Sequence, residues 1–191
     1  MGNCSRNCDG TDAATRGAAP SPASILIIGY GNTLRRDDGV GVSVAERLAT
    51  QPRSGVQIIA CHQLTPELAE PISRAAAVVF VDAVADGPRH VRMRRIRARA
   101  VVPSLAHASS PALLLGLARA VFGRQPPAWL LTIPGEDFGL GEGFSTLAQA
   151  GVRTALERIE AWLRRQQLPC ARAGKNGLGR TSPAGSFADQ A

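Results

Sequence analysis

The feature that most constrains the fold is a short apolar run that leads through two glycines into a charged loop. Residues 25–28 are isoleucine and leucine without interruption, a pattern typical of a strand that is buried on both faces of a sheet. Gly29 and Gly31 follow, and glycine allows the backbone to turn sharply at the carboxyl end of a strand. Because open α/β sheets bind ligands at that end of their strands, we expect residues 32–38 to lie over a site.

The glycine pair does not extend to a dinucleotide-binding fingerprint. That fingerprint needs a third glycine where this chain has Leu34. It also needs an acidic residue about 20 residues further on, where the chain has Ala60 and Cys61. These differences exclude a Rossmann-type dinucleotide site.

Two adjacent acids, Asp37 and Asp38, stand before a helical pattern formed by Val40, Val44 and Leu48. An aspartate at a helix N-cap accepts hydrogen bonds from free amides and favours the helix dipole. Capping therefore accounts for one of the two acids and stays open for either. The second acid needs another explanation, and chemistry at the sheet edge is the alternative.

The remaining sequence alternates between apolar strands and amphipathic helices. Further strands are expected at 56–60, 76–82, 90–101 and 128–133. Helices are expected at 65–75, at 110–122 with Leu113, Leu117 and Val121 on one stripe, and after the glycine-rich loop, with Val152, Leu156, Ile159 and Leu163 on the buried face. The alternation predicts an α/β protein: a three-layer α/β/α sandwich with a mostly parallel central sheet, of the phosphorylase/hydrolase-like kind.

The chain of 191 residues is long enough for one domain with a full core. Residues 1–22 and 169–191 are rich in small and polar residues without periodicity, so we expect two disordered tails around a working domain at 23–168. The start has no apolar signal segment, and no apolar run reaches the ~18 residues that span a membrane. We therefore expect a cytoplasmic protein with no membrane partner, and a monomer.

Charge and cysteine usage exclude some partners. The net charge is +7, and much of it lies at 89–99, where no aromatic residue interleaves the arginines to stack bases. We interpret that segment as a solvated strand near a sheet edge and expect no specific nucleic-acid binding. The spacing of Cys4 and Cys8 lacks a second pair, so incidental thiols are favoured over a metal site.

Three side chains are expected to meet at the carboxyl edge of the sheet: Asp38 after the first strand, Asp82 at the end of the third, and His107 in the loop before the third helix. Two carboxylates and an imidazole suit nickel, zinc, manganese or iron. Each residue also has a structural alternative, as a cap, a turn former and a backbone-bonded loop histidine respectively. Residue type and spacing leave both interpretations open.

The same residues resemble the hydrogenase maturation proteases, which trim a C-terminal extension from the large subunit of nickel-iron hydrogenases. The resemblance rests on GYGNTLRRDDGVG at 29–41, VVFVDA at 78–83, His107, and TIPGEDFGLGEG at 132–143, and it covers roughly residues 25–163. It implies that Asp38, Asp82 and His107 recognise nickel that the immature large subunit supplies. Asp37 matches the neighbouring motif acid.

The resemblance implies an endopeptidase in which water attacks a metal-polarised carbonyl, with Asp37 or Asp38 as candidate catalytic base. The segment 61–66 resembles family members that serve soluble cytoplasmic hydrogenases. Two alternatives remain open. One is a peptidyl-tRNA hydrolase-like enzyme, which has a catalytic histidine where this chain has residues 36–38. The other is a non-catalytic, nickel-binding chaperone module for the immature subunit.

Overall fold

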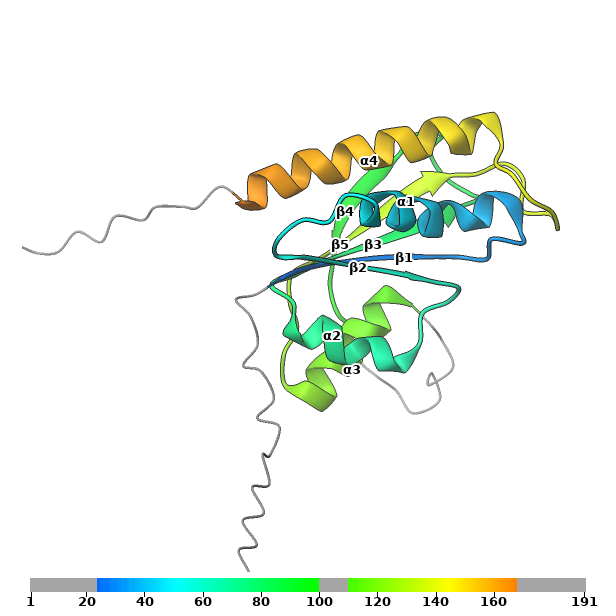
Figure 1. Cartoon of the computed structure of the whole chain (residues 1–191). Coiled ribbons are helices and arrows are strands. Elements are labelled where there is room, and N and C mark those ends of the chain that lie inside the picture. Colours follow the sequence, from blue (N-terminus) through cyan, green and yellow to red (C-terminus); the bar gives the residue numbers. More distant parts are fainter. Residues whose placement is uncertain (1–23, 100–109, 168–191) are drawn as a thin grey trace, which may run out of the picture.

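The computed structural model describes residues 24–99 and 110–167. A five-stranded sheet forms its centre, with strand order β2-β1-β3-β5-β4 (Figure 1). The strands are β1 (Ile25–Tyr30), β2 (Val56–Cys61), β3 (Ala77–Val84), β4 (Arg92–Ile96) and β5 (Ala128–Pro134). All neighbouring strands are parallel except β4 and β5, so the carboxyl ends of β1, β2, β3 and β5 share one edge.

Helices cover both faces of the sheet. α1 (Val40–Ala49) and α4 (Thr146–Gln167) lie on one face, and α2 (Ala69–Arg74) and α3 (Pro111–Phe122) lie on the other (Figure 1). Two short 3-10 helices, η1 (Arg36–Gly39) and η2 (Pro66–Leu68), lead into α1 and α2. This is the three-layer α/β/α arrangement with a mostly parallel sheet that the sequence predicted.

The uninterrupted apolar run of β1 serves two cores. Ile25 and Ile27 pack with α1 and α4, whereas Leu26 and Ile28 pack with α2 and α3. Successive side chains of a strand point to opposite faces, so a strand between two helical layers needs an apolar residue at every position. The predicted burial of this strand on both faces is confirmed.

The arginine-rich segment forms the edge strand β4, as expected, although the regular strand covers only residues 92–96. It pairs antiparallel with β5 and has no second neighbour in the described sheet. Ile96 is buried, while Arg95 is exposed and its guanidinium lies 5.9 Å from the ring centroid of Trp129. Charged side chains thus guard this edge of the sheet.

The predicted apolar stripe of α3 is confirmed only in part, because Leu113 and Leu117 are half-buried. Leu114, Leu115 and Ala118 are buried, whereas Val121 is 62% exposed. Nearly every residue from 111 to 122 is apolar, so the period of the pattern does not distinguish one face of the helix from another. The predicted helix ends are confirmed: Ser110 Oγ accepts a hydrogen bond from the Leu113 amide, and Gly123 ends α3 with a left-handed φ of 69°.

Several sequence predictions fall outside the described residues. They are the two tails, Cys4, Cys8 and His107. None of the helices between residues 24 and 99 or between 110 and 167 combines the length and the apolar character needed to cross a membrane.

Candidate functional site

The glycines of the 29–41 motif bring α1 against the carboxyl ends of two strands. A Cβ on Gly29 would lie 2.0 Å from the carbonyl oxygen of Gly41. A Cβ on Gly41 would lie 2.4 Å from the carbonyl oxygen of Tyr30 and 2.5 Å from that of Val81. No larger residue fits this close approach, so these two glycines place the helix start and the acids before it at the sheet edge.

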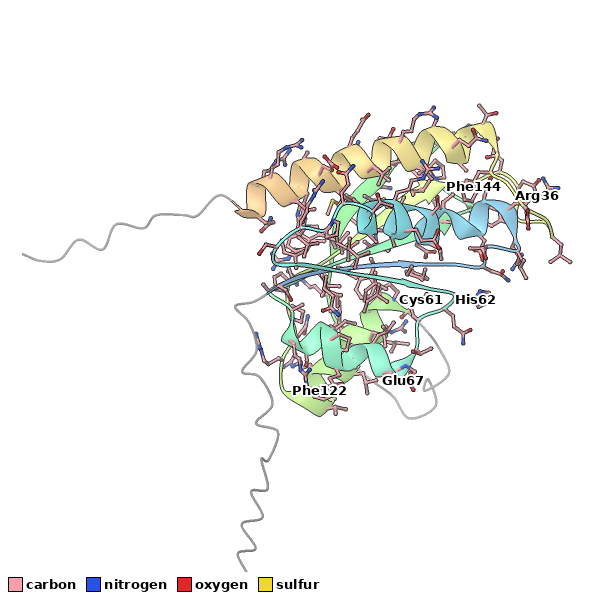
Figure 2. The ribbon with its side chains drawn as sticks, in the orientation of Figure 1. Arg36, Cys61, His62, Glu67, Phe122 and Phe144 are labelled. Atoms are coloured by element: carbon pink, nitrogen blue, oxygen red, sulfur yellow. The ribbon has the colours of Figure 1, made fainter. Side chains whose placement is uncertain are left out.

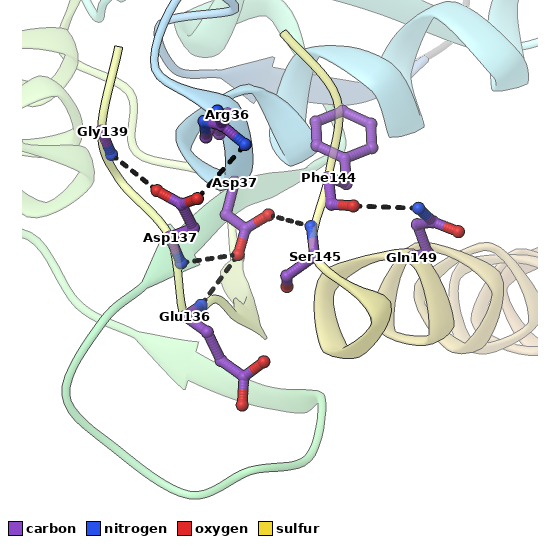
Figure 3. A network of polar contacts seen from close by, with 8 residues as sticks. All are labelled: Arg36, Asp37, Glu136, Asp137, Gly139, Phe144, Ser145 and Gln149. Carbon is purple, nitrogen blue, oxygen red and sulfur yellow. Dashed lines mark hydrogen bonds and ion pairs between the residues drawn. The ribbon is translucent and has the colours of Figure 1, made fainter. Parts of the chain in front are cut away.

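Asp37 forms hydrogen bonds with the glycine-rich loop that follows β5 (Figure 3). Its side chain is fully buried. Its Oδ2 accepts hydrogen bonds from the amides of Glu136 (2.8 Å) and Asp137 (3.0 Å), and its Oδ1 accepts one from the amide of Ser145 (2.7 Å). One carboxylate therefore joins η1 to a loop about 100 residues further along the chain.

This environment keeps Asp37 charged. Burial raises the pKa of Asp37, but the backbone hydrogen bonds from Asp137, Ser145 and Glu136 outweigh it and lower the pKa below its ordinary value. The N-cap prediction is wrong for both acids, because Gly39 precedes α1 and neither η1 nor α1 has a side-chain cap. Asp37 is buried with both carboxylate oxygens hydrogen-bonded, whereas Asp38 is partly exposed.

The loops on either side of Asp37 are also joined directly. The Gly141 amide donates to the Leu34 carbonyl (2.9 Å), and the Arg36 amide donates to the Gly141 carbonyl (3.2 Å). Arg36 also pairs with Asp137 through their side chains, with 3.3 Å between Nη1 and Oδ2. In Figure 2, Arg36 lies beside the start of α1, and His62 lies at the same end of the sheet.

Asp38 and Asp82 lie at the same edge of the sheet, close enough for their charges to interact. The Asn32 amide donates to Asp38 Oδ2 (2.9 Å). The Tyr30 hydroxyl donates to Asp82 Oδ2 (2.6 Å). Tyr30, Asp38 and Asp82 are all partly buried. Strand β3 runs two residues past Asp82, so this aspartate lies within the strand and not at its predicted end.

The two carboxylates repel each other. Burial raises the pKa of Asp82, hydrogen bonds from Tyr30 and the Ala83 backbone lower it, and the charge of Asp38 raises it again, so that its net pKa is above the ordinary value. Burial, together with the charges of Asp82 and Asp38, raises the pKa of Tyr30 far above its ordinary value. A divalent cation between the acids would relieve this repulsion, so the pair fits a metal.

The described residues do not complete a metal site. Within 24–99 and 110–167, no three His, Cys, Asp or Glu residues gather closely enough to hold an ion. His107, the third predicted ligand, lies outside these ranges. The nearby Cys61 is partly buried and burial raises the pKa of its thiol, which disfavours the thiolate that binds metal.

A groove of about 400 Å³ opens beside the acid pair. Tyr30 and Asp82 form one part of its lining, residues 94–97 a second, and residues 110–112 a third. His107 belongs to the stretch of sequence between the last two of these segments. The groove gives a ligand access to Asp82.

The solved structures to which this chain is similar belong to one class of protein. No family model matches the sequence, and no curated protein matches it either. The structure, however, is similar to a hydrogenase maturating endopeptidase, HybD, from Escherichia coli, with 26% identity and a TM-score of 0.59 over 75% of this chain and 94% of that one.

Two further solved structures give the same result. An endopeptidase from Escherichia coli has 25% identity and a TM-score of 0.61 over 75% of this chain and 94% of that one. The [NiFe] hydrogenase maturation protease HycI from Thermococcus kodakarensis has 25% identity and a TM-score of 0.60 over 74% and 93%. All three of these proteins are endopeptidases by description, and they share the α/β fold of this chain. The chain is thus similar in structure to hydrogenase maturation endopeptidases over more than nine-tenths of their length.

Proposed function

We propose that the protein is an endopeptidase that removes the C-terminal extension from the nickel-loaded large subunit of a nickel-iron hydrogenase. The observation that carries this proposal is the similarity to hydrogenase maturation endopeptidases over more than nine-tenths of their length. The acid pair at the carboxyl edge of the sheet supports it, because Asp38 and Asp82 are close enough for their charges to interact. The immature large subunit is then the partner.

In this proposal nickel arrives with the substrate. Asp38 and Asp82, together with His107, contact the nickel of the immature subunit, and the cation offsets the repulsion between the carboxylates. Asp38, held by the Asn32 amide, is the candidate base that takes a proton from the attacking water. Water adds to the scissile carbonyl, the C–N bond breaks, and the new amine takes a proton.

Different observations bear on the two alternative functions. The comparisons favour the endopeptidases over a peptidyl-tRNA hydrolase-like enzyme. A chaperone module that holds the immature subunit without cutting it is distinguished by a cleavage assay. Nickel dependence, a cytoplasmic location, a monomeric state and the absence of specific nucleic-acid binding are further parts of the proposal, and they rest on the sequence arguments above.

The test is cleavage of purified precursor large subunit, nickel-loaded and nickel-free, by the purified full-length protein. We expect the nickel-loaded precursor to lose a short C-terminal peptide, seen as a mobility shift and by mass spectrometry, and the nickel-free precursor to stay intact. Equal cleavage of both forms contradicts nickel recognition. Binding of the precursor without cleavage of either form supports the chaperone alternative.

A further inference from the structure

Tyr30 stands beside Asp82 because of strand register. Strands β1 and β3 pair in parallel as far as Gly29 and Val81, so the next residue on each strand, Tyr30 and Asp82, are neighbours. The Tyr30 hydroxyl donates to Asp82 Oδ2 at 2.6 Å. A hydrogen bond of this length to a carboxylate is charge-assisted and among the stronger kinds. It fixes one oxygen of Asp82.

A second hydroxyl flanks Asp82 and does not take this role. Thr132 of β5 is the register partner of Asp82 on the other side of β3. No hydrogen bond in the described part of the chain joins the Thr132 side chain to Asp82, whereas Tyr30 makes one. The orientation of the carboxylate is therefore set from β1, the strand whose continuation also carries Asp38.

The two acids are restrained in the same manner. The Asn32 amide holds Oδ2 of Asp38, and the Tyr30 hydroxyl holds Oδ2 of Asp82. Groups that hydrogen-bond to a metal ligand fix its direction, and their loss typically weakens metal binding by about 10- to 100-fold. The sequence did not single out Tyr30, because residue type and spacing do not reveal a partner 52 positions away.

We propose that Tyr30 is a positioning residue, which holds the Asp82 carboxylate in the direction that meets the nickel ion. This inference rests on the proposed function, in which Asp82 contacts nickel. Tyr30 itself does not contact the ion or the scissile bond in this account. Its effect reaches the ion through Asp82 alone.

The test compares three forms of the full-length chain: wild type, Tyr30→Phe and Thr132→Val. Each substitution removes one hydroxyl beside Asp82 and nearly preserves side-chain shape. Binding of Ni²⁺ is measured by calorimetric titration, and processing of the nickel-loaded precursor is measured as kcat and KM. We expect Tyr30→Phe to raise the Kd for Ni²⁺ and the KM for the loaded precursor about 10- to 100-fold. Thr132→Val should match wild type in both, and all three forms should unfold at similar temperatures.

Two results overturn the positioning role. One is a Tyr30→Phe variant that binds Ni²⁺ as tightly as wild type, and the other is a Thr132→Val variant that loses as much affinity as Tyr30→Phe. If wild type does not bind free Ni²⁺, the KM for the nickel-loaded precursor decides, and an unchanged KM in Tyr30→Phe overturns the positioning role. The proposed function fails separately, if wild type leaves the nickel-loaded precursor uncut or cuts the nickel-free precursor equally well.

Discussion

The region around Asp37 and the corner formed by Tyr30, Asp38 and Asp82 lie at the same edge of the sheet and differ in how their carboxylates are satisfied. Asp37 is fully buried and accepts three backbone hydrogen bonds, which hold its pKa below the ordinary value. Asp82 has its pKa raised by burial and by the charge of Asp38. Backbone hydrogen bonds satisfy Asp37, whereas no ion pair within residues 24–99 and 110–167 involves Asp38 or Asp82.

This difference suggests separate roles for Asp37 and Asp38, which are adjacent in one motif. A buried carboxylate that accepts hydrogen bonds from three amides stabilises the loop that it joins, because charged acceptors form the stronger hydrogen bonds. Two acids held close without an ion pair to either cost stability, and perturbed carboxylates of this kind are common at functional sites. In the proposed function, the motif therefore supplies the frame of the site through Asp37 and its chemistry through Asp38.

The largest effect on stability is expected from Asp37→Asn. The substitution removes the charge and places an amide donor against backbone donors, so at least one buried N–H group loses its acceptor. We expect the free energy of unfolding to fall by about 3 kcal/mol, measured by urea denaturation at pH 7.

The matched control for this variant is Asp137→Asn. Asp137 lies in the same loop, is 47% exposed and pairs with Arg36, so the same chemical change there should cost less than about 1 kcal/mol. An Asp37→Asn variant as stable as its control contradicts the anchoring role of Asp37.

The smallest effect on stability, with the opposite pH dependence, is expected from Asp82→Asn. The raised pKa of Asp82 means that wild type loses stability as pH rises above the ordinary value of 3.8 and through the raised pKa. An asparagine does not titrate and still accepts from Tyr30, so the variant should be no less stable than wild type at pH 7, within about 1 kcal/mol.

Asp37 should show the reverse pH slope. Its lowered pKa means that its contribution is present above the ordinary value of 3.8 and is lost as pH falls through the lowered pKa. Urea denaturation of wild type, Asp37→Asn and Asp82→Asn between pH 3 and pH 7 compares the two slopes. If both variants lose stability relative to wild type as pH rises, the contrast between the two regions is wrong.

Most of the fold could be predicted from the sequence because the relevant signals are local. The apolar runs of β1 and β3 are interpretable without knowledge of their neighbours, and Ser110 and Gly123 mark the ends of α3 by backbone chemistry that a few residues determine. The buried face of α3 was not predictable in this way. Where nearly every residue is apolar, tertiary packing decides which face is buried.

The site was only partly predictable because its contacts are long-range. Sequence spacing placed Asp38 and Asp82 at one edge, since parallel strands share their carboxyl ends. It did not reveal that Asp37 bonds to residues 136, 137 and 145, or that Tyr30 bonds to Asp82. The partners of Asp37 depend on how the loop after β5 folds back, and the partner of Tyr30 depends on the register of β1 and β3. Hydrophobic periodicity determines neither of these.

The most direct test of the account is Asp38→Asn, measured for both unfolding and processing. An asparagine oxygen still accepts from the Asn32 amide, so we expect the free energy of unfolding to change by less than about 1 kcal/mol. Processing of the nickel-loaded precursor should fall at least about 100-fold, because a neutral amide is a poor metal ligand and no base. An Asp38→Asn variant that is stable and processes the precursor at the wild-type rate contradicts the account.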